Sequence, residues 1–191
     1  QDAFRFTSNN EKTLYTLNYG IRLSHWSYTK ETIVSPRVSL GIIPAFNENI
    51  TMRFATGLYY QAPFFKELRD TTTQNGITYA LLNSKAKSQR SIHFIAGFDY
   101  RFRMNNRSFK FTAEAYYKAL VPYSVNNVKV VYYGSNESSG HAAGIDLKLY
   151  GEFVPGTDSW LSLSLMNTSM KLNGKSIPLP TDQRYAINMF F

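Results

Sequence analysis

The chain carries carboxylates and histidines that could support catalysis or bind a metal, but their spacing is typical of neither. A pair of carboxylates could act as general acid and base. The candidates for such a pair are Asp99, Glu114, Asp146 and Glu152. No nucleophile signature accompanies them and the sequence GxSxG is absent, so we expect no enzyme. His25, His93 and His141 lack metal-ligand spacing and the chain contains no Cys, so we expect no metal site and no cofactor.

The basic residues also fail to form a recognisable site. Lys and Arg number 21 against 13 Asp and Glu, which gives a formal net charge of +8. Such an excess ordinarily suggests an anionic partner. The basic residues alternate with apolar ones instead of clustering, so we do not expect nucleic acid to be that partner.

The charged residues belong to segments in which every second residue is apolar. Such a two-residue period predicts β-strands with one apolar and one polar face. We expect about eight strands, over residues 13–26, 35–44, 50–60, 90–103, 109–120, 141–153, 160–167 and 184–191. A strand extension is also expected at 128–133, inside a loop.

The connections between these segments alternate in length. Short turns are expected at 45–49, 104–108 and 155–158, an intermediate connection at 27–34, and long loops at 61–89, 121–140 and 168–183. Outer-membrane barrels have short periplasmic turns and long external loops. This comparison places both ends of the chain on the periplasmic side, and it predicts an antiparallel up-and-down transmembrane β-barrel.

Composition is compatible with that fold class. The 191 residues suffice for one domain, and no run approaches the roughly 18 consecutive apolar residues of a membrane helix. Aromatic residues reach 16%, which fits interfacial girdles but fits a soluble β-sandwich core equally well. The mean hydropathy is only −0.30 because alternation disperses the apolar residues.

Two sets of side chains are candidates for function in a barrel. Charged residues that avoid the apolar face could line a lumen or contact a plug, although a solvated polar wall is the plainer interpretation of any one of them. This set is Arg22, Arg37, Arg53, His93, Asp99, Arg101, Glu114, Asp146, Lys148, Glu152 and Arg184. Polar and aromatic residues where a strand enters a long loop could contact a ligand, or could anchor the interface or pack the loop. They are Tyr59, Tyr60, Gln61, Phe64 and Phe65.

Several sequence segments resemble the barrel of TonB-dependent outer-membrane receptors, in particular the branch with a carboxypeptidase-regulatory-like N-terminal domain. The segments are SPRVSL at 35–40, RFATGLYYQAPFFKELR at 53–69, QRSIHF at 89–94, FKFTAEAYYK at 109–118, GID at 144–146 and PTDQR at 180–184. The resemblance covers nearly the whole chain.

The resemblance implies an outer-membrane receptor of a Gram-negative bacterium that takes up a scarce solute, with energy supplied through TonB. Its partners would be outer-membrane lipid, a plug domain, the remaining barrel strands, the TonB complex indirectly, and a small solute or metal chelate. A complete barrel of this family has about 22 strands. We therefore expect residues 1–191 to be part of a larger barrel that lacks the plug and the TonB-engaging segment.

Two alternatives remain open. The first is a self-contained eight-stranded outer-membrane barrel with a structural or adhesive role, which would need backbone pairing between 13–26 and 184–191. The second is a soluble lipocalin-like binder with its apolar face turned inward. A membrane barrel instead requires its apolar set to point outward and to form no closed core. That set is Phe94, Phe98, Tyr100, Phe102, Phe109, Phe111, Leu147, Leu149, Leu161 and Leu163.

Overall fold

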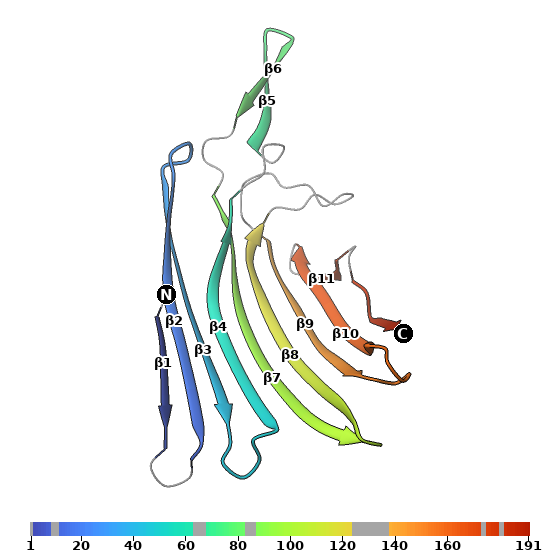
Figure 1. Cartoon of the computed structure of the whole chain (residues 1–191). Coiled ribbons are helices and arrows are strands. Elements are labelled where there is room, and N and C mark those ends of the chain that lie inside the picture. The colour runs from blue at the N-terminus through green and yellow to red at the C-terminus, as the bar shows by residue number, and fades with distance from the viewer. Residues whose placement is uncertain are drawn as a thin grey trace.

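The computed structural model describes residues 2–8, 12–62, 68–82, 87–123, 138–172, 175–179 and 182–191. Nearly all of these residues lie in strands or in the turns between them (Figure 1). The strands are β1 (Asp2–Thr7), β2 (Leu14–Trp26), β3 (Glu31–Ile43), β4 (Ile50–Gln61), β5 (Arg69–Gln74), β6 (Ile77–Leu82), β7 (Gln89–Met104), β8 (Arg107–Tyr123), β9 (Ser138–Gly151), β10 (Ser159–Leu172), β11 (Lys175–Pro178) and β12 (Tyr185–Phe190). Within the described part no helix is long and apolar enough to cross a membrane.

Ten strands form one antiparallel sheet in which sequence neighbours are neighbours in space. The order is β1-β2-β3-β4-β7-β8-β9-β10-β11, and β12 also pairs with β10. The turns after β3, β7 and β9 all lie at the lower end of the sheet in Figure 1. The predicted up-and-down topology and the shared end of these turns are therefore confirmed.

Local sequence explains the tight turns. Asn105 and Asn106 both have positive φ, 50° and 62°, as a two-residue β-hairpin turn requires. Between β9 and β10, Pro155 precedes Gly156, which has φ 79°, and the N–H of Thr157 donates to the carbonyl of Val154 at 3.1 Å. Pro followed by a left-handed Gly is the type II turn pattern, which fixes the reversal there.

The prediction of about eight strands was too low. β1 is a short edge strand that pairs with Leu14–Tyr19 of β2, and it begins opposite Tyr19. We expected residue 1 to lie at the short-turn end. This expectation was wrong, because Asp2 lies beside the middle of β2. β11 is only four residues long and forms by pairing with β10. The long loop at 61–89 contains the hairpin β5–β6, whose turn is Asn75-Gly76 with φ 52° and 78°.

Several strands are longer than their sequence period suggests. β3 begins at Glu31, so the connection expected at 27–34 shortens to a turn at 27–30. β8 extends to Tyr123 and β10 to Leu172, because backbone pairing continues after the apolar alternation has faded. β9 ends at Gly151, two residues before the predicted end. The extension expected at 128–133 lies outside the described residues.

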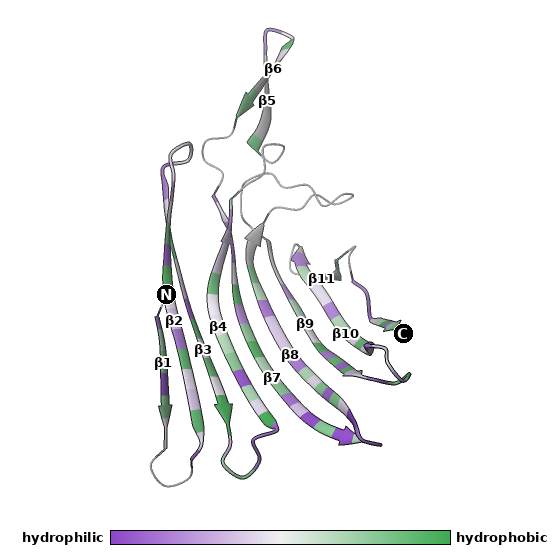
Figure 2. Cartoon of the chain, viewed as in Figure 1, coloured by the Kyte–Doolittle hydropathy of each residue, from purple (hydrophilic) through white to green (hydrophobic). Residues whose placement is uncertain are grey.

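The sheet is a single layer, and the described residues form no closed hydrophobic core. Large apolar side chains at mid-strand are exposed: Phe54 by 47%, Phe94 by 52% and Leu165 by 46%. Alternating polar and apolar bands run along the strands in Figure 2. The set predicted to point outward lies together on this face, since its members are in cross-strand register with one another. Phe109 is the exception in exposure: it is only 5% exposed, because the rings of Phe102 and Phe153 lie against it. This arrangement contradicts a soluble binder with an apolar interior.

The sheet is also open. β1 and the β11/β12 pair occupy opposite edges, and no ladder joins β2 to β12 among the described residues (Figure 1). The self-contained eight-stranded barrel required that ladder. The first predicted strand does not present a wholly free edge, because β1 covers its lower half and leaves Gly20–Trp26 without a partner on that side in the described part.

Candidate functional site

Charged strand residues gather on one face of the sheet, which we call the polar face. Residues opposite one another in register point to the same side of a sheet. One such row runs from Arg53 through Gly97 and Glu114 to Asp146. Register and alternation place nine of the predicted lumen residues on this face: Arg22, Arg37, Arg53, His93, Asp99, Arg101, Glu114, Asp146 and Lys148. That this face lines a lumen stays a prediction.

Asp99 is the centre of an ion-pair network on the polar face. Its side chain is only 4% exposed, and it pairs with Arg53 from β4. Lys110 of β8 lies 3.5 Å from the same carboxylate, and the hydroxyl of Thr112 donates to it at 2.8 Å. Gly97 leaves room for Arg53, because a Cβ there would lie 3.3 Å from the guanidinium. The network ties β4, β7 and β8 together.

A second group on the polar face, nearer the long loops, combines one cation with two rings. The guanidinium carbon of Arg37 lies 4.4 Å from the ring centre of Tyr59, and that ring stacks on His93 at 4.1 Å. Gly57 makes the stack possible, since a Cβ there would lie 3.0 Å from Cγ of Arg37. His93 is held in turn by Ser91, whose hydroxyl lies 2.9 Å from the imidazole Nε2. Side chains from β3, β4 and β7 thus build one stack.

A third group lies on the same face near the short turns. The ammonium of Lys148 sits 4.4 Å from the ring of Tyr150 and 4.3 Å from that of Trp160. Trp160 stacks in turn on Phe190 of β12, with ring centres 6.5 Å apart. Cation–π contacts of this kind can orient a lysine side chain even where no carboxylate pairs with its ammonium group.

Two predicted lumen residues lie just outside the strands. Glu152 follows β9, and its carboxylate accepts a hydrogen bond from the N–H of Gly156 in the type II turn. Arg184 precedes β12 and pairs with Asp182 at 2.7 Å. Glu152 therefore stabilises the turn between β9 and β10, and Arg184 stabilises the segment that leads into β12.

The residues predicted at the loop entrance do not act as one group. Tyr59 belongs to the polar-face stack, whereas Tyr60 pairs with Arg90 and points to the opposite side. Gln61 is the exposed last residue of β4. Phe64 and Phe65 lie outside the described residues. Ligand contact by these residues stays a prediction.

Some cations of the polar face were missing from the predicted set, among them Lys110 and Lys118. Lys110 lies opposite Arg101 and completes the Asp99 network, and Lys118 lies opposite His93. Alternation places both on the charged face of β8, so the period contained that signal. Their partners depend on the register between β7 and β8, which alternation does not determine.

Asp182 fastens the connection between β11 and β12. Its carboxylate accepts hydrogen bonds from the N–H of Thr168 at 2.8 Å, from the Thr168 hydroxyl at 3.2 Å and from Arg184. The backbone hydrogen bond from Thr168 is the main cause that lowers the pKa of Asp182 below its usual 3.8. An acid with a lowered pKa in the folded state stabilises that state above the unfolded pKa.

We therefore expect this connection to loosen as the pH falls below 3.8 and through the lowered pKa of Asp182. Hydrogen exchange of the Thr168 amide, corrected for the intrinsic rate, should accelerate in that range. Asp182→Asn should show weaker protection at neutral pH and little further change in acid. Equal acid sensitivity in both proteins would contradict this assignment.

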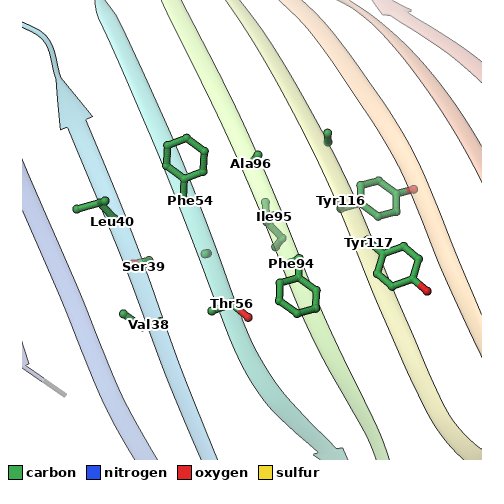
Figure 3. Close-up of a pocket in the computed structure, with 12 residues that line it drawn as sticks. Val38, Ser39, Leu40, Phe54, Thr56, Phe94, Ile95, Ala96, Tyr116 and Tyr117 are labelled. Atoms are coloured by element: carbon green, nitrogen blue, oxygen red, sulfur yellow. The ribbon is translucent and has the colours of Figure 1, made fainter.

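The opposite, apolar face contains a shallow hollow between aromatic rings. In Figure 3 the rings of Phe54, Phe94 and Tyr117 stand around Ala96 and Thr56, on neighbouring strands β4, β7 and β8. Its lining is predominantly apolar. A hollow of this kind suits acyl chains of lipid better than a polar solute.

No group of three or more His, Asp or Glu in the described ranges is placed to hold a metal ion. The chain forms an open antiparallel sheet with one charged face and one exposed apolar face. These properties define the wall of a transmembrane β-barrel, in which lipid-facing and lumen-facing residues alternate.

Comparison with known families agrees with this class of fold. The family model described as "TonB dependent receptor-like, beta-barrel" matches residues 1–190. The chain therefore belongs to the TonB-dependent receptor-like β-barrel family, a family of outer-membrane receptors and transporters. Searches of curated proteins and of solved structures each returned no match.

Proposed function

We propose that the chain forms part of the wall of an outer-membrane receptor that takes up a scarce solute with energy supplied through TonB. The observation that supports this most directly is the separation of the two faces. Mid-strand carboxylates and cations lie on the polar face, while the other face exposes apolar side chains at mid-strand. In this proposal the apolar face meets lipid of a Gram-negative outer membrane, and the polar face surrounds the solute path and the plug.

The two sheet edges support a wall that continues beyond these strands. An unpaired backbone group in hydrocarbon costs several kcal/mol, so an open edge does not persist in lipid. The outer edges of β1 and β12 have no partner among the described residues. We propose that further strands of the same receptor pair with these edges and that a plug domain fills the enclosed space.

The transport role can be tested with the full-length receptor gene. Cells with and without the gene would be grown on single scarce nutrients, including iron chelates, cobalamin and oligosaccharides, with TonB active or deleted. We expect at least one nutrient for which loss of the receptor and loss of TonB cause the same growth defect. Growth that depends on the receptor but not on TonB would overturn energised uptake.

The orientation is separately testable because the 191 residues contain no Cys. We expect a cysteine at Asn75, in the β5–β6 turn, to react with a membrane-impermeant maleimide on intact cells. A cysteine at Asn105, in the turn after β7, should react only after the outer membrane is permeabilised. The two turns lie at opposite ends of the structure in Figure 1. Labelling of both turns on intact cells would contradict the orientation.

A further inference from the structure

The cations of the polar face differ in what surrounds them. Three of the cations nearer the short turns have partners: Arg53 and Lys110 pair with Asp99, and Lys148 lies over two rings. Towards the long loops lie Arg22, Arg37 and Lys118. Arg37 and Lys118 lie 4.4 Å and 5.3 Å from ring centres, those of Tyr59 and Tyr116, but none of the three cations forms an ion pair within the described part of the chain. We call these three cations, with Tyr59 and His93, the loop-end patch.

Carboxylates on the described strands of the main sheet lie away from this patch or are already engaged. Glu114 and Asp146 occupy a row two steps closer to the short turns than the row of Arg37, His93 and Lys118. Glu31, at the loop end of β3, accepts hydrogen bonds from the N–H of Ser88 at 3.0 Å and from its hydroxyl at 2.7 Å. Among the described residues of the main sheet, the patch therefore presents net positive charge.

Arg37 is held in a geometry suited to binding an anion. Stacking on Tyr59 restrains the plane of the guanidinium, and the empty space above Gly57 lets the side chain lie flat along the sheet. A planar guanidinium presents its N–H groups at its edge, where they match the paired oxygens of a carboxylate or a phosphate. Because the side chain is already ordered, less conformational entropy is lost on binding.

The other cations lie within reach of the same ligand. Lys118 is opposite His93, and both Lys118 and Arg37 act electrostatically on that imidazole. Arg37 and Lys118 stand three strands apart, which corresponds to about 14 Å between their backbones. Long side chains narrow this distance, so two anionic groups of one small solute can engage both cations.

We propose that the loop-end patch binds anionic groups of the transported solute, so that this receptor takes up a solute carrying carboxylate, phosphate or sulfate. The proposal rests on the transport function above and specifies its substrate class. The patch lies at the end of the wall from which the long loops extend, where a solute from outside would first meet the lumen. An acidic segment of the receptor's own plug is the competing occupant, and the test separates the two.

The test measures binding of citrate and of inorganic pyrophosphate to purified full-length receptor by calorimetry at about 0.1 M ionic strength, where the Debye length is about 10 Å, with triethyl citrate as the uncharged counterpart of citrate. We expect saturable binding of at least one anion and none of the ester. Arg37→Gln combined with Lys118→Gln should weaken the binding about tenfold or more, as expected for the loss of charge-assisted hydrogen bonds. Added salt should weaken the remaining binding.

Two further variants make the result specific. Arg101→Gln combined with Lys148→Gln removes the same charge from the other end of the polar face. It should change affinity by less than about twofold, because the two cations lie about 20 Å or more along the strands from the patch, roughly twice the Debye length at about 0.1 M ionic strength. Gly57→Ala keeps every charge but displaces Arg37, so it should also weaken binding. Electrophoretic heat-modifiability checks that each variant is folded.

Three outcomes would overturn the proposal: no binding of either anion by the wild type, equal losses in the two double variants, or a double variant at the patch that lowers thermal stability while anion binding persists. The last result would indicate that the plug occupies the patch. Because calorimetry needs no TonB, absent anion binding with intact TonB-dependent growth refutes this proposal alone. Anion binding without TonB-dependent growth refutes energised uptake alone.

Discussion

Replacing Phe94 by Arg in the full-length receptor should destabilise the folded barrel by about 2–4 kcal/mol, the cost measured for Arg near the middle of a lipid-facing strand. Phe94 is 52% exposed on the apolar face and lies inside β7, as the sixth of its 16 residues. In water such an exposed position would tolerate a charge. In a bilayer the guanidinium would have to be buried in hydrocarbon, so the size of the effect measures whether this face meets lipid.

The adjacent residue supplies the matched control. Ile95 lies on the polar face, in register with Ala55 of β4 and Tyr116 of β8. Ile95→Arg adds the same side chain one position away but directs it towards the other side of the wall, so it should cost less than about 1 kcal/mol. Both variants would be compared by urea titration in lipid vesicles, with folded barrel detected by heat-modifiability. Equal losses would contradict the membrane assignment.

The two-residue period is sufficient to predict these opposite faces. Phe94 and Ile95 are both large and apolar, so neither residue alone reveals its side of the sheet. Their faces follow from the phase of the whole strand, in which Asp99 and Arg101 are odd and Phe98 and Tyr100 are even. A phase maintained over so many residues also explains why the strand at 90–103 was predicted nearly to its ends.

The elements that the sequence analysis missed are those stabilised by a partner strand. β11 contains four residues and ends at Pro178, so its period is too short to detect. The hairpin β5–β6 has a recognisable Asn75-Gly76 turn, but it lies within a segment without sustained alternation, and we assigned that segment to a loop. Pairing supplies backbone hydrogen bonds that no local pattern encodes.

The contacts of the candidate site depend on register in the same way. Alternation places Arg53, Asp99 and Lys110 on one face without indicating which side chains meet. The pairing of Thr51 with Asp99 and of Asp99 with Thr112 brings the three strands into contact around one carboxylate. If the register between two of these strands shifted by two residues, each side chain would stay on the same face but the contacts around Asp99 would be lost. The positions of Arg37 over Gly57 and of Arg53 over Gly97 likewise depend on the strand register and could not be predicted from the sequence.

We expect Asp99→Asn to lower the free energy of unfolding by about 2 kcal/mol, the range measured for hydrogen bonds to charged groups. Asparagine keeps the size of the side chain and an acceptor for the Thr112 hydroxyl. It removes the charge that Arg53 and Lys110 face, at a position only 4% exposed. Arg184→Gln removes the exposed partner of an ion pair, since the Arg184 side chain is 66% exposed, and it should cost less than about 1 kcal/mol in the same vesicle assay.

A double-mutant cycle between Arg53 and Asp99 separates their interaction from other effects of each change. Arg53→Gln alone leaves the buried Asp99 carboxylate with Lys110 and Thr112, whereas Asp99→Asn alone leaves two cations beside a neutral amide. Once one partner has gone, removing the other should cost less, so the double variant should be more stable than the sum of the single losses predicts by about 1 kcal/mol. Additive losses would show that the contact does not couple β4 to β7. Coupling would identify Asp99 as the residue that stabilises this part of the wall by holding three strands in one register.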